Sequence, residues 1–506
     1  MHGSGDPVVS RRALLWNAIA NSAAFIAQLG VAFFLAPLLV RYLGRERYGI
    51  WSFVESILAY FTLFDLGIAA TLVRFVPKFR AENDGNSLTK IVSACLLVFT
   101  CAGIVVLIIG AVVFVLVMNA STVIPAELGG ESQQLAAIAL ISLAMSLPLS
   151  IFPAMLDGLG RSAAKSAVRT MFLFARLAGT LAAVYCNGNL AALAVVQAAT
   201  VLGENLVLLF LVRRWIPDLK FVPWRTDRAT LKLIRGYSVD SFLAMLAGRI
   251  SFKTDAIVIG LCGYLGLIPF FDMPSRLVEY AKNLIRSATT TLTPAFSALE
   301  AKSDRSAIRS LFLNGSRYAL YLSLPIYLAF LLFGGEFLKL WLGDDLYRVH
   351  GEPVLWALGS VLPVAMLQSV AARVLYGTGE IRRFARLMLL EAGLNLALSL
   401  VLIGPLGITG VAIGTALPNL VISLVVILQV CRKLELNDST FFRETLLAPL
   451  VVVVALVPTW LGLQHIFPPT TRWNYAALIA AGVAVGALLT VALEQGRQRL
   501  HPAAKS

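Results

Sequence analysis

The sequence has little charge for its length. Asp, Glu, Lys and Arg make up 14% of its 506 residues, whereas soluble proteins average about 25%. The mean hydropathy is +0.81, and 58% of the residues are hydrophobic. These values exclude an ordinary soluble domain and are typical of a protein that crosses a membrane many times.

Motifs for nucleotide, metal or nucleophilic chemistry are also missing. The sequence contains no GxxxxGK[ST] phosphate loop, no HExxH zinc motif and no GxSxG nucleophile elbow. Its five cysteines form no CxxC pair, and its four histidines lack ligand spacing. We therefore expect no metal, no cofactor and no disulfide framework. Because no loop is long enough to hold a soluble catalytic domain, we predict that the protein is not an enzyme.

Long apolar stretches dominate what is present. About fourteen of them reach the roughly 20 residues that a helix needs to cross a bilayer. The first is too long for a secretory signal peptide, so we treat it as a span. The stretches lie near 13–40, 48–73, 90–118, 134–156, 166–186, 190–212, 238–261, 268–293, 308–333, 353–376, 386–404, 408–431, 444–464 and 473–494. We predict an all-α polytopic membrane protein.

The distribution of basic residues predicts the topology. Most of the 42 Lys and Arg residues lie in the N-terminus and in every second loop, which places both termini and the 213–236 loop in the cytoplasm. The net charge of +14 then reflects contact with anionic lipid headgroups rather than with nucleic acid. One hairpin departs from the rule, because 41–49 should face outward yet holds Arg41, Arg45 and Arg47.

An internal repeat is visible in the positions of the glycines between the predicted spans. A shift of 219 positions (263 minus 44) places Leu43-Gly44 on Cys262-Gly263, residues 156–160 on 375–379, and Gly188 on Gly407. Six spans separate the copies, so both halves have the same orientation and form a parallel repeat. We predict six-helix bundles at 1–214 and 237–433, a basic cytoplasmic linker at 215–236, and two extra spans with a cytoplasmic tail at 434–506.

The eighth predicted span carries a polar stripe. At 100° per residue, Asp272, Arg276, Glu279, Asn283 and Arg286 fall within about 80° of arc. Each ion would cost roughly 2.5–3.5 kcal/mol at the bilayer centre. The stripe should therefore face protein or a water-filled cavity.

These charges predict a cavity for an anionic group, because arginine binds phosphate oxygens through two parallel hydrogen bonds. The alternative is that they form structural ion pairs, such as Asp272 with Arg276. Candidate acids for ion coupling, or for balancing the cavity, are Asp255, Asp272 and Glu279. Candidate cationic residues are Arg249, Lys253, Arg276, Lys282, Arg286 and Arg373.

Two stretches carry a family resemblance. Residues 42–81 contain an LG-x3-YG entry to the second span and a DLG-x6-R element formed by Asp65, Gly67 and Arg74, and 252–260 reads "FKTDAIVIG" with Asp255 inside it. Over about residues 10–435 the chain resembles the polysaccharide-export branch of the multidrug/oligosaccharidyl-lipid/polysaccharide (MOP) exporters, the Wzx-type O-antigen flippases.

The resemblance implies a MATE-like fold and a flippase in a bacterial inner membrane. Such a protein moves a polyprenyl-pyrophosphate-linked oligosaccharide, of an O-antigen or exopolysaccharide, from the cytoplasmic to the periplasmic leaflet by alternating access. Its implied partners are that substrate and membrane lipids, with a polysaccharide polymerase and chain-length proteins as candidates. We expect a monomer to suffice, since both halves of the pathway lie in one chain.

Three other functions remain as alternatives: a cation-coupled multidrug exporter, a lipid II flippase and a membrane scaffold for polysaccharide synthesis. The drug exporters commonly keep an acid in the first span, but 13–40 contains neither Asp nor Glu. Residues 21–44 do not match the arginine and aspartate pattern of the lipid II flippases. Both departures favour the oligosaccharide flippase.

Overall fold

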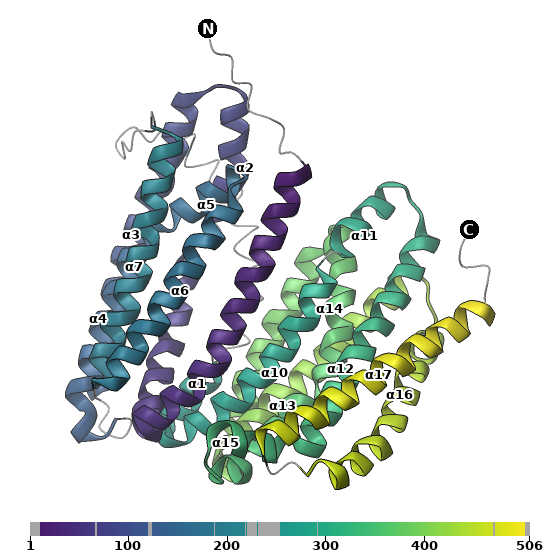
Figure 1. The fold of residues 1–506 in the computed structure, drawn as a ribbon. Coiled ribbons are helices and arrows are strands. Elements are labelled where there is room, and N and C mark those ends of the chain that lie inside the picture. Colours follow the sequence, from purple (N-terminus) through teal and green to yellow (C-terminus); the bar gives the residue numbers. More distant parts are fainter. Residues whose placement is uncertain are drawn as a thin grey trace. The chain divides into compact units, whose positions relative to one another are not determined.

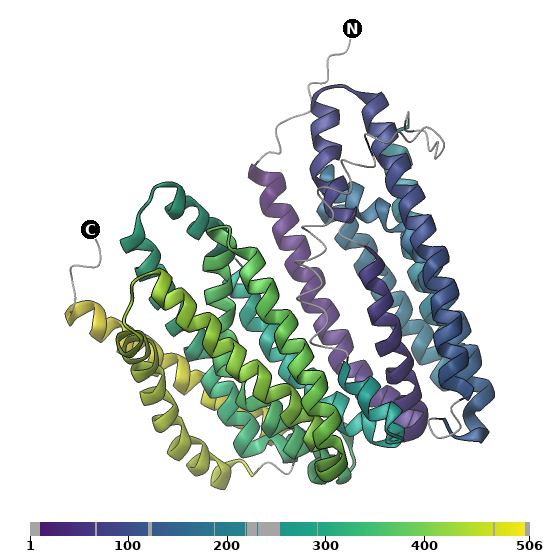
Figure 2. The same ribbon diagram turned by 180° about the vertical axis from the view of Figure 1, so that it is seen from behind.

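The computed structural model describes residues 11–65, 68–119, 124–186, 188–217, 219, 230, 254–290, 292–468 and 471–500. Helices account for nearly all of this described part, and it contains no strand. The chain divides into two compact units (Figures 1 and 2). Unit 1 comprises Met1–Arg249 and Gly260–Gly266, and unit 2 comprises Ile250–Ile259 and Leu267–Ser506.

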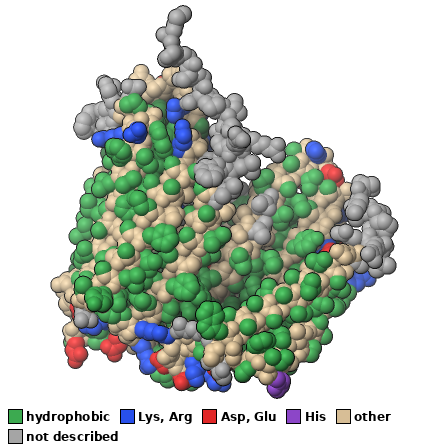
Figure 3. All heavy atoms as spheres, in the orientation of Figure 1, with side chains coloured by type: hydrophobic (Ala, Val, Ile, Leu, Met, Phe, Trp, Pro, Cys, Tyr) green, Lys and Arg blue, Asp and Glu red, His purple; other side chains and the backbone are tan. Residues whose placement is uncertain are grey.

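Unit 1 is built from long helices with short connections. Its main helices are α1 (Arg11–Phe61), α2 (Ile68–Ala81), α3 (Gly85–Asn119), α4 (Gly129–Leu149), α5 (Ile151–Gly158), α6 (Ser162–Tyr185) and α7 (Leu190–Trp215), with short 3-10 turns η1 (Thr62–Asp65) and η2 (Ala126–Leu128). Pairs such as α3 with α4 and α6 with α7 pack against each other. Apolar side chains cover the lengths of these helices, as lipid contact requires (Figure 3).

Unit 2 is also built mainly from helices, and it ends in the extra helix pair. Its helices are α10 (Ile268–Thr289), α11 (Leu292–Ala301), α12 (Arg305–Leu342), α13 (Glu352–Ser360), α14 (Leu362–Gly377), α15 (Ile381–Lys433), α16 (Asp438–Ile466) and α17 (Arg472–Leu500). The unit boundary falls within α9 (Thr254–Leu261) and the turn η5 (Leu265–Leu267), and a π-helical turn, η6 (Tyr347–Gly351), precedes α13. The extra pair packs on α12 through an apolar cluster of Tyr321, Leu328, Phe333, Val452, Leu456, Trp460 and Leu478.

Two of the helices contain a sharp bend at glycine. In α1, Gly44 has φ 73° and ψ 176°, and in α15, Gly407 has φ 58° and ψ −142°. Side chains with a Cβ rarely adopt such angles, whereas glycine does so at little steric cost. Each bend lies between two of the predicted spans. Helix α15 contains both spans on either side of its bend, whereas the predicted span 48–73 begins in α1 and extends past its end at Phe61 into η1 and α2.

Ten helices in the described chain are long and apolar enough to cross a membrane, which confirms the all-α polytopic fold. The bent helices α1 and α15 each count once among them. Helix α10 is not included, because its Asp272, Arg276, Glu279, Lys282 and Arg286 make it too polar. Only α9 of the seventh predicted span lies within the described residues. The exact count of fourteen therefore stays a prediction.

Two glycine pairs of the predicted repeat have similar backbone angles, whereas Gly407 has a positive φ and its counterpart Gly188 does not. Gly44 and Gly263 have φ of 73° and 83°, and Gly160 and Gly379, which the same shift pairs, have φ of 69° and 79°. The division at 1–214, 215–236, 237–433 and 434–506 remains a prediction, and most of the linker lies outside the described residues.

Helices α3 and α12 both begin with an aspartate cap. The shift of 219 positions matches the two caps to within one residue. Asp84 Oδ1 accepts a hydrogen bond from the Ser87 backbone N–H at 2.9 Å, and Asp304 Oδ1 accepts one from Ala307 N–H at 3.0 Å. Hydrogen bonds from Ser87 lower the pKa of Asp84. The hydrogen bond from the Ala307 backbone lowers the pKa of Asp304 in the same way. Such side-chain caps satisfy amides that the first helical turn leaves without partners.

Arg47, one of the three arginines in the basic hairpin 41–49, has an internal partner. Arg47 donates to both carboxylate oxygens of Glu131 at the start of α4, from Nε at 3.1 Å and from a terminal nitrogen at 2.9 Å. A two-pronged contact of this kind neutralises Arg47. It also places the α1 bend at the same end of unit 1 as the beginning of α4, as the predicted alternation of loops requires.

Candidate functional site

The predicted polar stripe lies along one face of α10. Asp272, Arg276, Glu279, Asn283 and Arg286 are all half-buried, while the apolar residues of the opposite face are buried. Arg276 Nε contacts Asp272 Oδ2 at 3.0 Å, and Arg286 contacts Glu279 Oε1 at 3.2 Å. The pair of Asp272 with Arg276 is the one that the structural alternative predicts. The four side chains are nevertheless 16–37% exposed, so they are accessible to a ligand.

A third arginine lies beside this stripe. Arg373 on α14 interacts electrostatically with Arg286, and a hydrogen-bonding contact of 3.2 Å between Thr289 Oγ1 and Ser369 Oγ joins the two helices one turn away. The Arg373 guanidinium stands 6.0 Å from the Tyr376 ring centroid, and its buried Nε has no hydrogen-bond partner within the described residues. Arg286 thus contacts the Glu279 carboxylate and also interacts with a second guanidinium group, that of Arg373, and neighbouring guanidinium groups favour a bound anion.

The other candidate cations fall into two groups. Lys282 interacts electrostatically with Glu279, Arg286, Glu391 and Asp255, so it connects the stripe to acids on neighbouring helices. Arg249 and Lys253 lie outside the described residues, and their convergence with α10 stays a prediction.

The structure describes two of the three family-motif residues, Asp65 and Arg74. Asp65 ends the short turn η1, and Gly67 lies outside the described residues. Arg74 is exposed on α2, with its Cζ 5.5 Å from the centroid of the Phe75 ring. Their predicted structural role stays a prediction.

Asp255 belongs to a separate, buried polar cluster. Thr415 Oγ1 donates to Asp255 Oδ1 at 2.9 Å, and Asn395 Nδ2 donates to Thr415 Oγ1 at 3.1 Å. Thr415 also lies 3.1 Å from the Val411 carbonyl oxygen. Asp255 is 8% exposed and Asn395 3%. The cluster therefore places the Asp255 carboxylate, the Thr415 hydroxyl and the Val411 carbonyl oxygen close together, and oxygen atoms of these kinds are the ligands of hard cations.

The two arms of α15 supply most of this cluster, and they lie side by side (Figure 2). One turn from Asn395, Asn419 Nδ2 donates to Glu391 Oε1 at 2.6 Å. Sequence reasoning did not single out Asn395, Thr415 or Asn419. A signal was present, since polar residues recur every four positions at 391, 395 and 399 and again at 415, 419 and 423.

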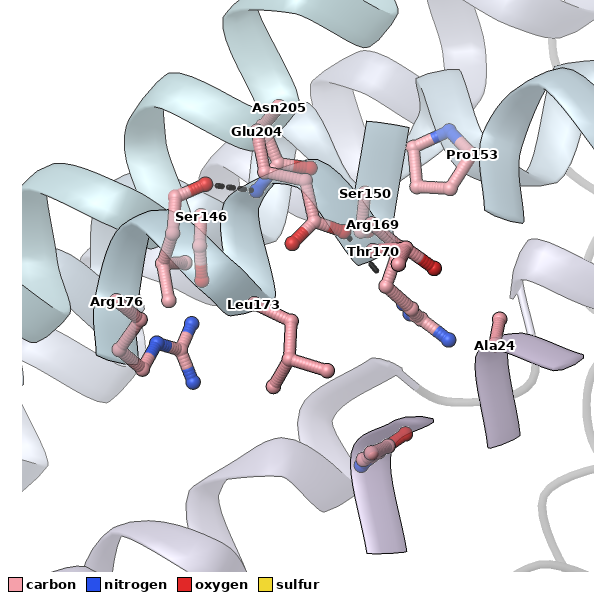
Figure 4. A pocket seen from close by; sticks show the side chains of 12 residues that line it. Ala24, Ser146, Ser150, Pro153, Arg169, Thr170, Leu173, Arg176, Glu204 and Asn205 are labelled. Carbon is pink, nitrogen blue, oxygen red and sulfur yellow. Dashed lines mark hydrogen bonds and ion pairs between the residues drawn. The ribbon is translucent and has the colours of Figure 1, made fainter. Parts of the chain in front are cut away.

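Unit 1 contains a polar cavity of about 450 Å³ between α1, α4, α5, α6 and α7 (Figure 4). Arg169 and Arg176 on α6 line it, with Glu204 and Asn205 on α7. None of these four residues is among the candidate site residues predicted from the sequence. Within the described residues, no group of three or more His, Cys, Asp or Glu side chains is arranged to hold a metal ion.

Comparisons with known proteins agree with this architecture. A family model described as "Polysaccharide biosynthesis protein" matches residues 14–300. The chain is 22% identical over 518 aligned positions to the "Uncharacterized membrane protein EpsK" of Bacillus subtilis (strain 168), and the alignment covers 95% of this chain and 96% of that protein.

Two solved structures share the fold. The lipid II flippase MurJ in an inward closed conformation has a TM-score of 0.72 at 15% identity, over 96% of this chain and 99% of that one. A multidrug resistance MATE family transporter of the MOP superfamily, in an inward-facing conformation, has a TM-score of 0.66 at 15% identity, over 81% and 94%. At these identities the similarity concerns the fold alone.

Proposed function

Because the chain belongs to the polysaccharide biosynthesis protein family, we propose that it is a flippase for a polyprenyl-pyrophosphate-linked oligosaccharide. The fold is the one found in MOP transporters and flippases, and the chain is not an enzyme. In this proposal the oligosaccharide moves from the cytoplasmic to the periplasmic leaflet of a bacterial inner membrane. The lipid tail stays in the bilayer while the polar head crosses through the protein by alternating access.

The half-exposed arginines of α10, together with Arg373, are the observation that carries the proposal. Arg286 and Arg373 repel each other electrostatically, and an incoming diphosphate would relieve that repulsion. Guanidinium groups bind phosphate oxygens through paired hydrogen bonds, and a low dielectric strengthens the attraction. A purely apolar or cationic drug would gain nothing from these groups.

The lipid extract of a deletion strain tests the proposed function. Mass spectrometry should find a polyprenyl-pyrophosphate oligosaccharide that accumulates in the cytoplasmic leaflet when the protein is absent. Its fragmentation would identify the sugar repeat unit. Intact surface polysaccharide without any accumulated intermediate would contradict the proposal.

A charge-swap series tests whether the α10 charges bind substrate or only hold the helices together. Arg286→Glu should abolish export. The double variant Glu279→Arg with Arg286→Glu restores the ion pair but moves the positive charge two turns along the helix. We expect this double variant to recover the melting temperature without recovering export. If export returned to the wild-type rate, the pair would be structural and the substrate site would lie elsewhere.

We further propose that Asp255 couples transport to a cation. The three candidate acids differ in their surroundings. Asp272 and Glu279 are paired with arginines, whereas Asp255 contacts the Thr415 hydroxyl, which lies beside the Val411 carbonyl oxygen. Lys282 also interacts with Asp255 electrostatically, so its ammonium group would compete with a bound cation. This competition links the cation site to the charged helix.

Transport by purified protein in liposomes tests this coupling. With wild-type protein, an inward gradient of Na⁺ or of protons should speed translocation of the lipid-linked substrate. Asp255→Asn keeps the size and the capacity for hydrogen bonds but removes the charge, so it should abolish that acceleration while slow, gradient-independent exchange persists. An unchanged gradient response in Asp255→Asn would exclude this residue as the coupling acid.

A further inference from the structure

The cavity of unit 1 has polar walls on several sides. Gln28 of α1, Arg169, Thr170 and Arg176 of α6, and Glu204 and Asn205 of α7 line its volume of about 450 Å³ (Figure 4). Small-molecule sites are commonly about 300–1,000 Å³. Along α6, Arg176 lies about 10 Å further from the helix start than Arg169, at 1.5 Å per residue. The two arginines therefore line the cavity about two helical turns apart.

Arg176 is held in place by a hydrogen bond. Arg176 Nε donates to Thr200 Oγ1 at 3.1 Å, and Thr200 in turn donates to the Val196 carbonyl at 2.8 Å. Among the described residues, the terminal guanidinium nitrogens of Arg176 donate no hydrogen bond, and the group interacts with Glu204 and Glu55 only electrostatically. The contact with Thr200 orients the guanidinium group, so its two terminal nitrogens can donate hydrogen bonds to an acceptor such as a carboxylate.

The nearest acid does not satisfy both arginines. Arg169 Nε stands 3.6 Å from Glu204 Oε1, beyond hydrogen-bonding distance. Glu55 accepts from Gln197 Nε2 at 3.3 Å and is not part of the cavity wall. Two arginines against one carboxylate leave the wall with a surplus of one positive charge. Such a surplus inside a membrane-spanning bundle favours an anionic ligand.

The neutral wall groups favour a ligand that also carries hydroxyls. Asn205 Nδ2 donates to the Val201 carbonyl at 2.9 Å, so its side-chain oxygen remains to accept a hydrogen bond. Gln28 and Thr170 each offer a donor and an acceptor at the same cavity. Sugar hydroxyls use donors and acceptors together, whereas a bare phosphate uses donors alone. The mixture therefore fits a sugar ring better than an inorganic anion.

The predicted duplication allows the two halves to be compared at one equivalent position. Arg176 on α6 is the repeat counterpart of Asn395 on α15, since 395 minus 219 is 176. Both donate to a threonine hydroxyl on the following span. In unit 2 that position adjoins the carboxylate of Asp255, which attracts a cation. In unit 1 the same position carries a fixed guanidinium, which attracts an anion.

We propose that the unit 1 cavity binds an acidic sugar, a ring bearing a carboxylate, within the oligosaccharide head of the substrate. The inference rests on the proposed flippase function and adds a selection by sugar charge. Arg176 binds the carboxylate, with Arg169 as a second cation nearer the N-terminal end of α6. Glu204, Asn205, Gln28 and Thr170 contact the hydroxyls.

Ligand-dependent melting of the full-length protein in detergent tests this assignment. The probes are glucuronic acid, its neutral counterpart glucose, and inorganic pyrophosphate. Because a ligand that binds only the folded state raises the melting temperature, we expect glucuronic acid to raise it at concentrations at least about tenfold lower than glucose. Arg176→Gln should weaken the response to glucuronic acid by about tenfold or more, as expected for loss of a charge-assisted pair.

Two further variants keep the test decisive. Arg214→Gln removes an exposed arginine at the end of α7, outside the cavity, and should respond as wild type does. Arg176→Lys keeps the charge without the planar fork, so it should retain a weakened response even if Arg176→Gln folds poorly. Equal responses to glucose and glucuronic acid, or a response that Arg176→Gln and Arg176→Lys both leave intact, would overturn the proposal.

The pyrophosphate probe separates two sources of negative charge. If pyrophosphate raised the melting temperature more than glucuronic acid did, and Arg176→Gln abolished the effect, the cavity would hold the carrier's diphosphate and the acidic-sugar assignment would be wrong. The flippase proposal is judged separately by the lipid extract of the deletion strain. Accumulation of a lipid-linked oligosaccharide made only of neutral sugars would support the flippase and overturn the acidic-sugar assignment.

Discussion

One hydroxyl group links Asp255 to the rest of its cluster. Thr415 Oγ1 contacts the Asp255 carboxylate at 2.9 Å and accepts from Asn395 at 3.1 Å. Thr415→Val keeps the shape but removes both contacts. Leaving a buried polar partner unsatisfied costs about 1–3 kcal/mol, so we expect lower stability and a transport rate that no longer responds to the cation gradient. Thermal melting and liposome transport measure the two effects.

Thr459 offers a matched control for this prediction. It lies within α16 and donates to the Ala455 carbonyl at 2.8 Å, a bond within its own helix. Thr459→Val should leave gradient-driven transport unchanged. If Thr415→Val behaved like Thr459→Val in both assays, the contact with Asp255 would have no role in coupling.

Two glycines of the C-terminal helix pair make a second comparison at the level of single residues. A Cβ at Gly482 would overlap the indole of Trp460, whereas a Cβ at Gly462 would meet nothing within 4 Å. Trp460 Nε1 also donates to the Leu478 carbonyl at 3.2 Å, so the indole is not free to move aside. Gly482→Ala should destabilise the protein by about 1–3 kcal/mol through overpacking.

Gly462→Ala serves as its control. Alanine is favoured over glycine by about 1 kcal/mol inside a helix, so this change should be neutral or slightly stabilising. Thermal melting of the two variants should therefore move in opposite directions. Equal destabilisation by both would show that helix packing at Trp460 does not set the difference.

Among the elements, α17 is attached to α12 by a buried ion pair as well as by apolar packing. Arg317, which is 4% exposed, contacts Glu494 at 3.1 Å, and the Tyr321 hydroxyl donates to the same carboxylate at 3.1 Å. Glu494→Ala leaves a buried guanidinium without its counter-ion, which costs about 3–5 kcal/mol. We expect a large fall in melting temperature and easier proteolysis of α17.

A double variant separates loss of charge balance from loss of contact. Replacing Arg317 and Glu494 together by methionine removes both ions, and such replacements of buried pairs are often neutral or stabilising. The double variant should recover most of the stability that Glu494→Ala loses. A double variant as unstable as the single one would mean that the pair's geometry, rather than its charge balance, holds α17.

The elements were largely predictable from the sequence, because apolar length determines where a helix can cross a bilayer. The bends at Gly44 and Gly407 coincide with glycines of the predicted repeat, and the stripe of α10 followed from helical periodicity. The contact between Asp255 and Thr415 spans 160 positions, which no local pattern determines. The unit 1 cavity was missed for a related reason, since Arg176 and Glu204 are single charges on different helices and form no stripe.

On the scale of the whole molecule, the two halves of the predicted repeat differ in chemistry. At the paired positions 176 and 395, unit 1 has the guanidinium of Arg176, whereas unit 2 has the amide of Asn395, whose partner Thr415 contacts the Asp255 carboxylate. A transporter that moves an anionic head against or along a cation gradient needs both kinds of site. We propose that unit 1 contributes substrate selection and that unit 2 contributes cation coupling in addition to its own arginines.

The predicted topology assigns opposite sides of the membrane to particular cysteines, and all the cysteines in the described chain are free. Cys186 and Cys262 are exposed in connections that should face outward, while Cys95 and Cys431 are buried. In right-side-out membrane vesicles, a membrane-impermeant maleimide should label single-cysteine variants that keep Cys186 or Cys262. A cysteine introduced by Asn86→Cys, at the exposed start of α3 on the opposite side, should react only after the vesicles are opened. The reverse pattern would invert the topology and place the basic loops outside, against the charge rule that predicted them inside.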